Sequence, residues 1–288
     1  MSIAISKFTP PKSEAWKFSG LKELDLRGLD LLSGTGPARH TFLGELPEEV
    51  VHIVGEQIMV DRLPLEADLV ATCKRLVVGE GSVLHYALLN ISSASARVFD
   101  FLTVEAGRNA KVTLTLINLG ASYTRQEITA VMKDPGADVR LRSLTVADAN
   151  CEIDQRTLQI HEAPDTKSDL LFKNVLSGSA RTIFSGMIRV CPGAQRTDAY
   201  QKNRNLILSD SAQANSLPGL EIQADDVRCT HGATCGKLDS DELFYLRSRG
   251  IAEPDAKRIL VGGFCEEILE SLPKDVVEEV RKKLGTER

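Results

Sequence analysis

The sequence predicts a mainly β protein whose core is a solenoid of stacked β coils, with a short arm before it and a helical segment after it. Between about residues 50 and 237, apolar residues recur at period two in short runs such as Val112, Leu114 and Leu116, which is typical of strands. Turn residues recur at positions 81, 107, 136, 164 and 193, separated by 26, 29, 28 and 29 residues. No helical pattern intervenes, so this period favours stacked coils over a doubly wound sheet.

A β-sandwich is the alternative architecture for such a strand-rich chain. Sandwich strands usually recur about every 8–12 residues with cleaner two-face alternation. Because the turn residues here are more widely and more regularly spaced, the solenoid is favoured.

The segment before the core, residues 1–40, is expected to form a short, partly helical arm. It contains Pro10 and, at Trp16, the only tryptophan of the chain. Residues 34–37 are rich in glycine and proline and mark a linker. The β core is therefore expected to span residues 41–237.

The last segment, residues 238–288, is predicted to be a helical domain. Asp239 offers an N-cap oxygen for a first helix, and Gly250 is suited to end that helix. Pro254 lies near the start of a second helix and Pro273 near the start of a third. Because so few residues cannot build a large core of their own, the segment is expected to dock on the solenoid or on a partner.

Composition limits the range of partners. The chain of 288 residues has 35 Lys and Arg against 40 Asp and Glu, a formal net charge of −5, which argues against sequence-independent nucleic-acid binding. The sequence shows no secretory signal, no run of apolar residues long enough to span a membrane, and too few cysteines for a disulfide framework. A reduced, cytoplasmic setting is expected.

The densest cluster of reactive side chains follows Asp225 and Asp226. In an extended strand Cys229 and His231 project to one face, where a thiolate and an imidazole are suited to iron or another soft metal. Spacing alone leaves three alternatives open: a metal-binding pair, a nucleophilic Cys–His pair, and a buried thiol beside a hydrogen-bonded structural histidine, which is the favoured reading. An unrelated β-helix hydrolase or lyase would need a groove of carboxylates, and adjacent Asp225 and Asp226 would point to opposite faces.

Five segments together resemble one known family, the SufB/SufD family of iron-sulfur cluster assembly proteins. They are Tyr200–Ser209, Leu220–Thr234, Leu243–Ile251, Gly262–Phe264 and, near the N-terminus, Glu14–Phe18. The similarity is dense from about residue 166 to 270 and rests on repeat character elsewhere. It implies a right-handed parallel β-helix. The chain looks short for the family, with a reduced N-terminal helical region.

The resemblance also favours one of the two types within the family. SufB proteins have a cysteine where this chain has Asn203, and a different run around His231, so the chain is similar to the SufD type. Cys229 and His231 then correspond to the pair implicated in assembly of a transient iron-sulfur cluster at the subunit interface. Cys235 departs from the expected aliphatic residue and is a further candidate ligand.

The implied partners are a SufB-like paralogue and a SufC-type ABC ATPase, with a homodimer when the paralogue is absent. The ATPase is expected to dock on the helical domain, where candidate contacts are Phe244, Tyr245, Arg247, Arg249 and Phe264. The sequence has no phosphate-binding loop, so no nucleotide is expected on this chain. Flavin binding stays open.

The function predicted from the sequence is that of a non-enzymatic scaffold subunit in iron-sulfur cluster assembly, of the SufD type. The alternative is a SufB-like or ancestral homodimeric scaffold that carries the cluster itself through Cys229, His231 and Cys235.

Overall fold

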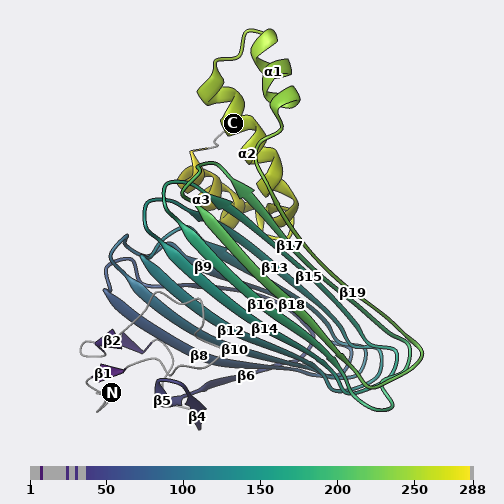
Figure 1. The fold of residues 1–288 in the computed structure, drawn as a ribbon. Coiled ribbons are helices and arrows are strands. Elements are labelled where there is room, and N and C mark those ends of the chain that lie inside the picture. The colour runs from purple at the N-terminus through teal and green to yellow at the C-terminus, as the bar shows by residue number, and fades with distance from the viewer. Residues whose placement is uncertain (1–6, 9–23, 26–29, 32–36, 286–288) are drawn as a thin grey trace.

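The computed structural model describes residues 7–8, 24–25, 30–31 and 37–285 (Figure 1). Most of the arm predicted over residues 1–40, including Trp16, lies outside these residues.

The described part of the chain contains nineteen strands and three helices. The strands are β1 (Lys7–Phe8), β2 (Leu24–Asp25), β3 (Asp30–Leu31), β4 (Ala38–Thr41), β5 (Gly44–Pro47), β6 (Glu49–Ile53), β7 (Glu56–Arg62), β8 (Leu69–Val78), β9 (Val83–Asn90), β10 (Arg97–Ala106), β11 (Lys111–Asn118), β12 (Tyr123–Met132), β13 (Asp138–Ala147), β14 (Glu152–His161), β15 (Lys167–Leu176), β16 (Arg181–Val190), β17 (Thr197–Ile207), β18 (Gln213–Ile222) and β19 (Val227–Gly236). The helices are α1 (Ser240–Ser248), α2 (Glu253–Leu269) and α3 (Lys274–Leu284).

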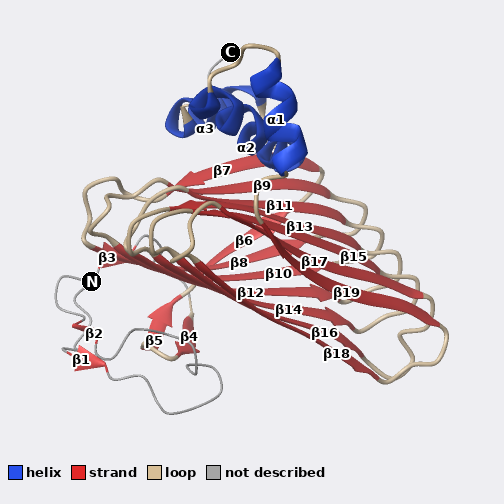
Figure 2. Ribbon diagram, turned by 45° about the horizontal axis from the view of Figure 1, so that its top comes forward, coloured by secondary structure: helices blue, strands red, loops and turns tan. Residues whose placement is uncertain are grey.

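Two parallel sheets face one another and form a solenoid of about six turns. One sheet has the order β18-β16-β14-β12-β10-β8-β3, with β6 also paired to β8, and the other has the order β19-β17-β15-β13-β11-β9-β7. Each turn of the chain contributes one strand to each sheet, as Figure 2 shows. The predicted β-solenoid is confirmed.

The turn residues recognised in the sequence all connect an even-numbered strand to the following odd-numbered strand. They stack on one another: the Asn109 amide donates to the Pro135 carbonyl at 3.1 Å, and Gly136 adopts a positive φ of 78° that favours glycine. A second series of turns joins the odd-numbered strands to the next even-numbered ones. These turns have more varied residues, so their periodicity is not evident in the sequence.

The space between the sheets holds the apolar core together with a buried polar ladder. Phe172 and Phe184 pack edge to face, with ring centroids 5.5 Å apart. Parallel, in-register pairing stacks four polar side chains along one line of the even-numbered sheet, in the order Thr72, Asp100, Gln126 and Gln155. These groups are buried and hydrogen-bonded to one another, as buried polar groups generally must be.

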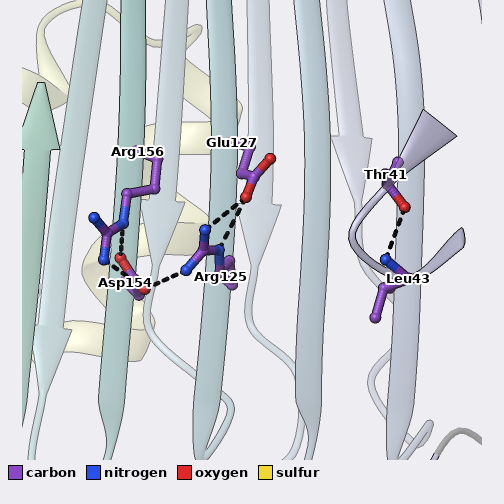
Figure 3. A network of polar contacts seen from close by, with 6 residues as sticks. All are labelled: Thr41, Leu43, Arg125, Glu127, Asp154 and Arg156. Carbon is purple, nitrogen blue, oxygen red and sulfur yellow. Dashed lines mark hydrogen bonds and ion pairs between the residues drawn. The ribbon is translucent and has the colours of Figure 1, made fainter. Parts of the chain in front are cut away.

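The outer face of the even-numbered sheet carries paired charges. The buried Asp154 carboxylate lies between Arg125 and Arg156, which donate to it at 2.7 and 2.6 Å, and Arg125 also pairs with Glu127 (Figure 3). The two arginines compensate the cost of burying the carboxylate.

The helices α2 and α3 pack on the outer face of the odd-numbered sheet (Figure 2). Apolar side chains of the sheet meet those of the helices there: Ala87, Leu89, Ile117, Leu144, Leu171, Val175 and Leu206 on the sheet, and Cys265, Ile268, Leu269, Leu272, Val276 and Val280 on the helical segment. Lys173 adds a polar contact, since its Nζ donates to the Phe264 carbonyl at 2.9 Å and pairs with Glu267 at 2.6 Å. Of the two docking surfaces expected for the helical segment, the structure uses the solenoid.

By contrast, α1 buries none of its residues and projects from the rest of the molecule (Figure 1). Among the described residues, no helix has the length and apolar character that crossing a membrane requires.

Candidate functional site at the end of the solenoid

Cys229 and His231 lie on β19, the last strand of the odd-numbered sheet. They pair in register with Ala199 and Gln201 of β17, whose side chains are buried between the sheets. Because facing alternates along a strand, Cys229 and His231 point to this same interior side. Their Cα atoms are about 7 Å apart, as two residues of an extended chain are. The predicted side-by-side arrangement of thiol and imidazole is therefore present.

The two side chains differ in burial. Cys229 is half-buried and packs against Ile188, Val190 and Ala199. Burial raises the pKa of its thiol, and the nearby Asp198 carboxylate raises it further. The pair therefore holds a protonated thiol in the isolated chain, and a metal or a cationic neighbour would be needed to stabilise the thiolate.

His231 is exposed and makes no hydrogen bond to any other residue in the described part of the chain. The interpretation of a buried, hydrogen-bonded structural histidine is therefore wrong for His231. It is correct for His161, which is fully buried and whose ring nitrogens lie 2.8 Å from the Thr166 hydroxyl and 2.9 Å from the Ser168 hydroxyl. Burial lowers the pKa of His161 to about 4, so that histidine stays neutral.

Cys235 is also exposed, but it does not join the pair. It stands six residues beyond Cys229 and pairs in register with Asn205, so the two cysteines are about 20 Å apart along the strand. Across the residues that the structure describes, no three His, Cys, Asp or Glu side chains gather in a way that suits a metal ion. The end of the solenoid thus has two neighbouring side chains that can act as metal ligands, Cys229 and His231, and one distant thiol, Cys235.

Beneath these residues lies a buried polar layer on β17 and β18. The sequence analysis named only one of its members, Asn203, and did not predict the layer. The Asn203 side-chain oxygen accepts hydrogen bonds from Asn205 at 2.8 Å and from Ser216 at 2.6 Å. Gln201, Asn203 and Asn205 share one face at period two, and this alternation of amides was a readable signal.

Four of the five residues expected to contact an ATPase lie at α1. Phe244 and Tyr245 are 72% and 56% exposed, and the Arg249 guanidinium stacks over the Tyr245 ring at 5.2 Å. Arg247 is exposed and pairs with Glu253 at 3.4 Å. Phe264 lies elsewhere, since it is partly buried against the solenoid with Lys173 over its ring at 4.9 Å.

Comparisons of the sequence with known proteins identify its family. A family model described as SUF system FeS cluster assembly, SufBD core domain, matches residues 48–264. The chain belongs to this family of iron-sulfur cluster assembly proteins.

Named relatives give the same result. The chain is 37% identical over 186 residues to an iron-sulfur cluster assembly SufBD family protein of Mycobacterium leprae, covering 62% of this chain and 47% of that protein. It is 34% identical over 168 residues to the iron-sulfur cluster assembly protein SufD of Escherichia coli, covering 58% of this chain and 40% of SufD. The chain therefore matches less than half the length of these relatives.

Proposed function

We propose that the protein is a SufD-type subunit of an iron-sulfur cluster assembly scaffold and pairs with a SufB-like paralogue. The observation that carries the proposal is the Cys229–His231 pair on β19, whose outer edge pairs with no other strand of the described part of the chain. The side chain at position 203, an asparagine where SufB-type proteins have a cysteine, supports the SufD type.

The proposed site is completed by a second chain. Thiolate and imidazole are ligands that iron accepts, but two donors do not fill the coordination of a cluster. A paralogue that adds its own strand beside β19 would bring further ligands to Cys229 and His231. In this account the cluster is cargo that forms between the subunits and leaves. The chain is a scaffold and not an enzyme.

A SufC-type ATPase would supply the energy for the assembly cycle. This chain has no phosphate-binding loop in its sequence, whereas α1 presents Phe244, Tyr245, Arg247 and Arg249 to solvent. Aromatic residues and arginine are the side chains most often found at the centre of protein interfaces. We therefore assign the ATPase contact to α1.

Anaerobic reconstitution with ferrous iron and sulfide tests the proposal. The chain alone is compared with the chain co-expressed with the paralogue and the ATPase. The proposal expects cluster absorbance and stoichiometric iron in the complex and little of either in the isolated chain. A stable, stoichiometric cluster on the isolated chain would contradict it and would support the alternative homodimeric scaffold that carries the cluster itself.

A further inference from the structure

One buried acceptor near the proposed site has no hydrogen-bond partner among the residues that the structure describes. The Gln201 side chain is 1% exposed, and its carbonyl oxygen Oε1 receives no hydrogen bond. Its amide nitrogen makes only a long contact of 3.4 Å to the Gly186 carbonyl. A buried acceptor without a donor destabilises the folded state, so this oxygen points to a group that donates to it in the working protein.

On the neighbouring strand β19, the side chain in register with Gln201 is that of His231, whose ring can donate a hydrogen bond. Gln201 and His231 are paired in register on β17 and β19, and both face the interior side. In-register side chains on one face of neighbouring strands are about 5 Å apart, which lets a long amide and an imidazole form a hydrogen bond. His231 has no other hydrogen-bond partner among the described residues, so its ring is free to turn toward Gln201.

We propose that Gln201 positions the His231 imidazole by accepting the proton of one ring nitrogen on Oε1. The other ring nitrogen then keeps its lone pair, directed away from Gln201. Histidines that bind metals generally donate their second ring N–H to a carbonyl or carboxylate, which fixes tautomer and ring orientation. Gln201 is thus a positioning residue that acts through His231, and only the identity of the cargo rests on the proposed function.

Gly186 supports this role from the opposite sheet. A Cβ built on Gly186 would lie 2.5 Å from Gln201 Oε1 and 2.6 Å from the other two amide atoms. Real Cβ atoms do not approach other atoms so closely, so any larger residue at position 186 would displace the Gln201 amide. The absence of a side chain at Gly186 therefore leaves the space that the Gln201 amide occupies.

The test measures the tautomer ratio of His231 from the ¹⁵N chemical shifts of its two ring nitrogens, in the full chain at a pH where the imidazole is neutral. Gln201→Met keeps the volume and removes the acceptor. Since one hydrogen bond contributes about 1 kcal/mol, the ratio should change about fivefold. Gly186→Ala should move it in the same direction. Gln201→Glu retains an acceptor oxygen and should restore the wild-type preference.

Gln159 provides a matched control. It is also a fully buried glutamine whose Oε1 has no partner, but it lies on β14, away from β19. Gln159→Met should leave the His231 ratio unchanged. Gly219→Ala is the matched glycine control, because its Cβ would press only on the flexible end of Met187, at 2.8 Å, and would lie at an ordinary contact distance of 3.7 Å from the Gly186 carbonyl oxygen.

An unchanged His231 tautomer ratio in Gln201→Met, with the variant folded, overturns the inference. This failure is distinct from failure of the proposed function, which cluster reconstitution measures. If the ratio changes as expected and the complex assembles no cluster on this chain's side chains, Gln201 still positions His231 and the proposed function is wrong.

Discussion

At the scale of single residues, the solenoid holds ionisable side chains in its interior and controls their charge by burial. Asp100 is fully enclosed and accepts hydrogen bonds from Thr72 and Gln126. Burial raises its pKa to about 6, against the lowering effect of those two hydrogen bonds. Asp100 is therefore a carboxyl group that the folded protein prefers to keep neutral.

This preference predicts a pH-dependent effect of Asp100→Asn. The pKa of Asp100 is higher in the folded than in the unfolded state, so wild-type stability falls as pH rises from about 4 to about 6. Above pH 6 the folded protein contains a buried charge that asparagine lacks, so Asp100→Asn should raise the free energy of unfolding by about 3 kcal/mol. Near pH 4 the difference should vanish. Urea denaturation at pH 4 and pH 8 measures both.

Asp210→Asn is the control, because Asp210 is 93% exposed and pairs with Lys237 at the surface. It should give no stabilisation at pH 8. A gain for Asp100→Asn that is equal at both pH values would show that charge burial is not its cause.

Residue-level prediction succeeded where local alternation was enough. The period of two placed Cys229 and His231 on one face, because side-chain direction in a strand depends only on sequence position. The relation of His231 to Gln201 was not predictable in this way. It depends on the pairing of residues 30 positions apart, which the stacking of β17 and β19 establishes.

At the scale of elements, the helical segment divides into two docked helices and one free helix. The caps predicted the ends: Asp239 accepts from the amides of Asp241 and Glu242 at 2.7 and 3.2 Å, and Gly250 follows α1 with a φ of 85°. Ile259 of α2 is 51% exposed, whereas Cys265 and Ile268, further along the helix, are fully buried. The C-terminal half of α2 packs against an apolar strip on the sheet. Five strands contribute to this strip, so the helix sequence alone does not predict which part of the helix is buried.

The free helix predicts where the ATPase partner binds. The double variant Phe244→Ala/Tyr245→Ala should weaken binding of the ATPase at least tenfold, because large exposed aromatics commonly dominate an interface. The melting temperature should not change, since α1 buries no residue. Calorimetric titration with the ATPase measures the affinity.

Val54→Ala is the matched control, because Val54 is 78% exposed and lies between β6 and β7. It should bind the ATPase as the wild type does. Wild-type affinity in the α1 double variant would mean that another surface contacts the ATPase.

At the scale of the whole molecule, the solenoid ends in two long strands with free edges. In the described part of the chain, β18 pairs only with β16 and β19 only with β17. Such edges invite pairing with another chain. The regular turn spacing was enough to predict the solenoid, because each coil repeats the same geometry. The varied residues of the second turn series concealed its periodicity. The distance between Cys229 and Cys235 follows from the structure, in which both lie on the single strand β19.

The free edges predict that an inward-pointing charge blocks assembly. Ala233 lies on the interior side of β19 and is exposed at the open end. Ala233→Lys should prevent pairing with the paralogue and self-association, because inward-pointing charges are a device by which proteins protect sheet edges. Sedimentation velocity measures both. Thr230→Lys, on the outer face of the same strand, should pair normally, and loss of pairing in both variants would point to unfolding of β19.

The central claim is that this chain contributes Cys229 and His231 to a cluster formed between subunits. The most direct test is the iron content of the anaerobically reconstituted complex that contains His231→Ala, measured together with the melting temperature of the variant chain. The account predicts a large loss of iron with only a small fall in melting temperature, because the exposed His231 ring contributes to the fold no more than its proposed hydrogen bond to Gln201. Wild-type iron content in the folded complex would contradict it.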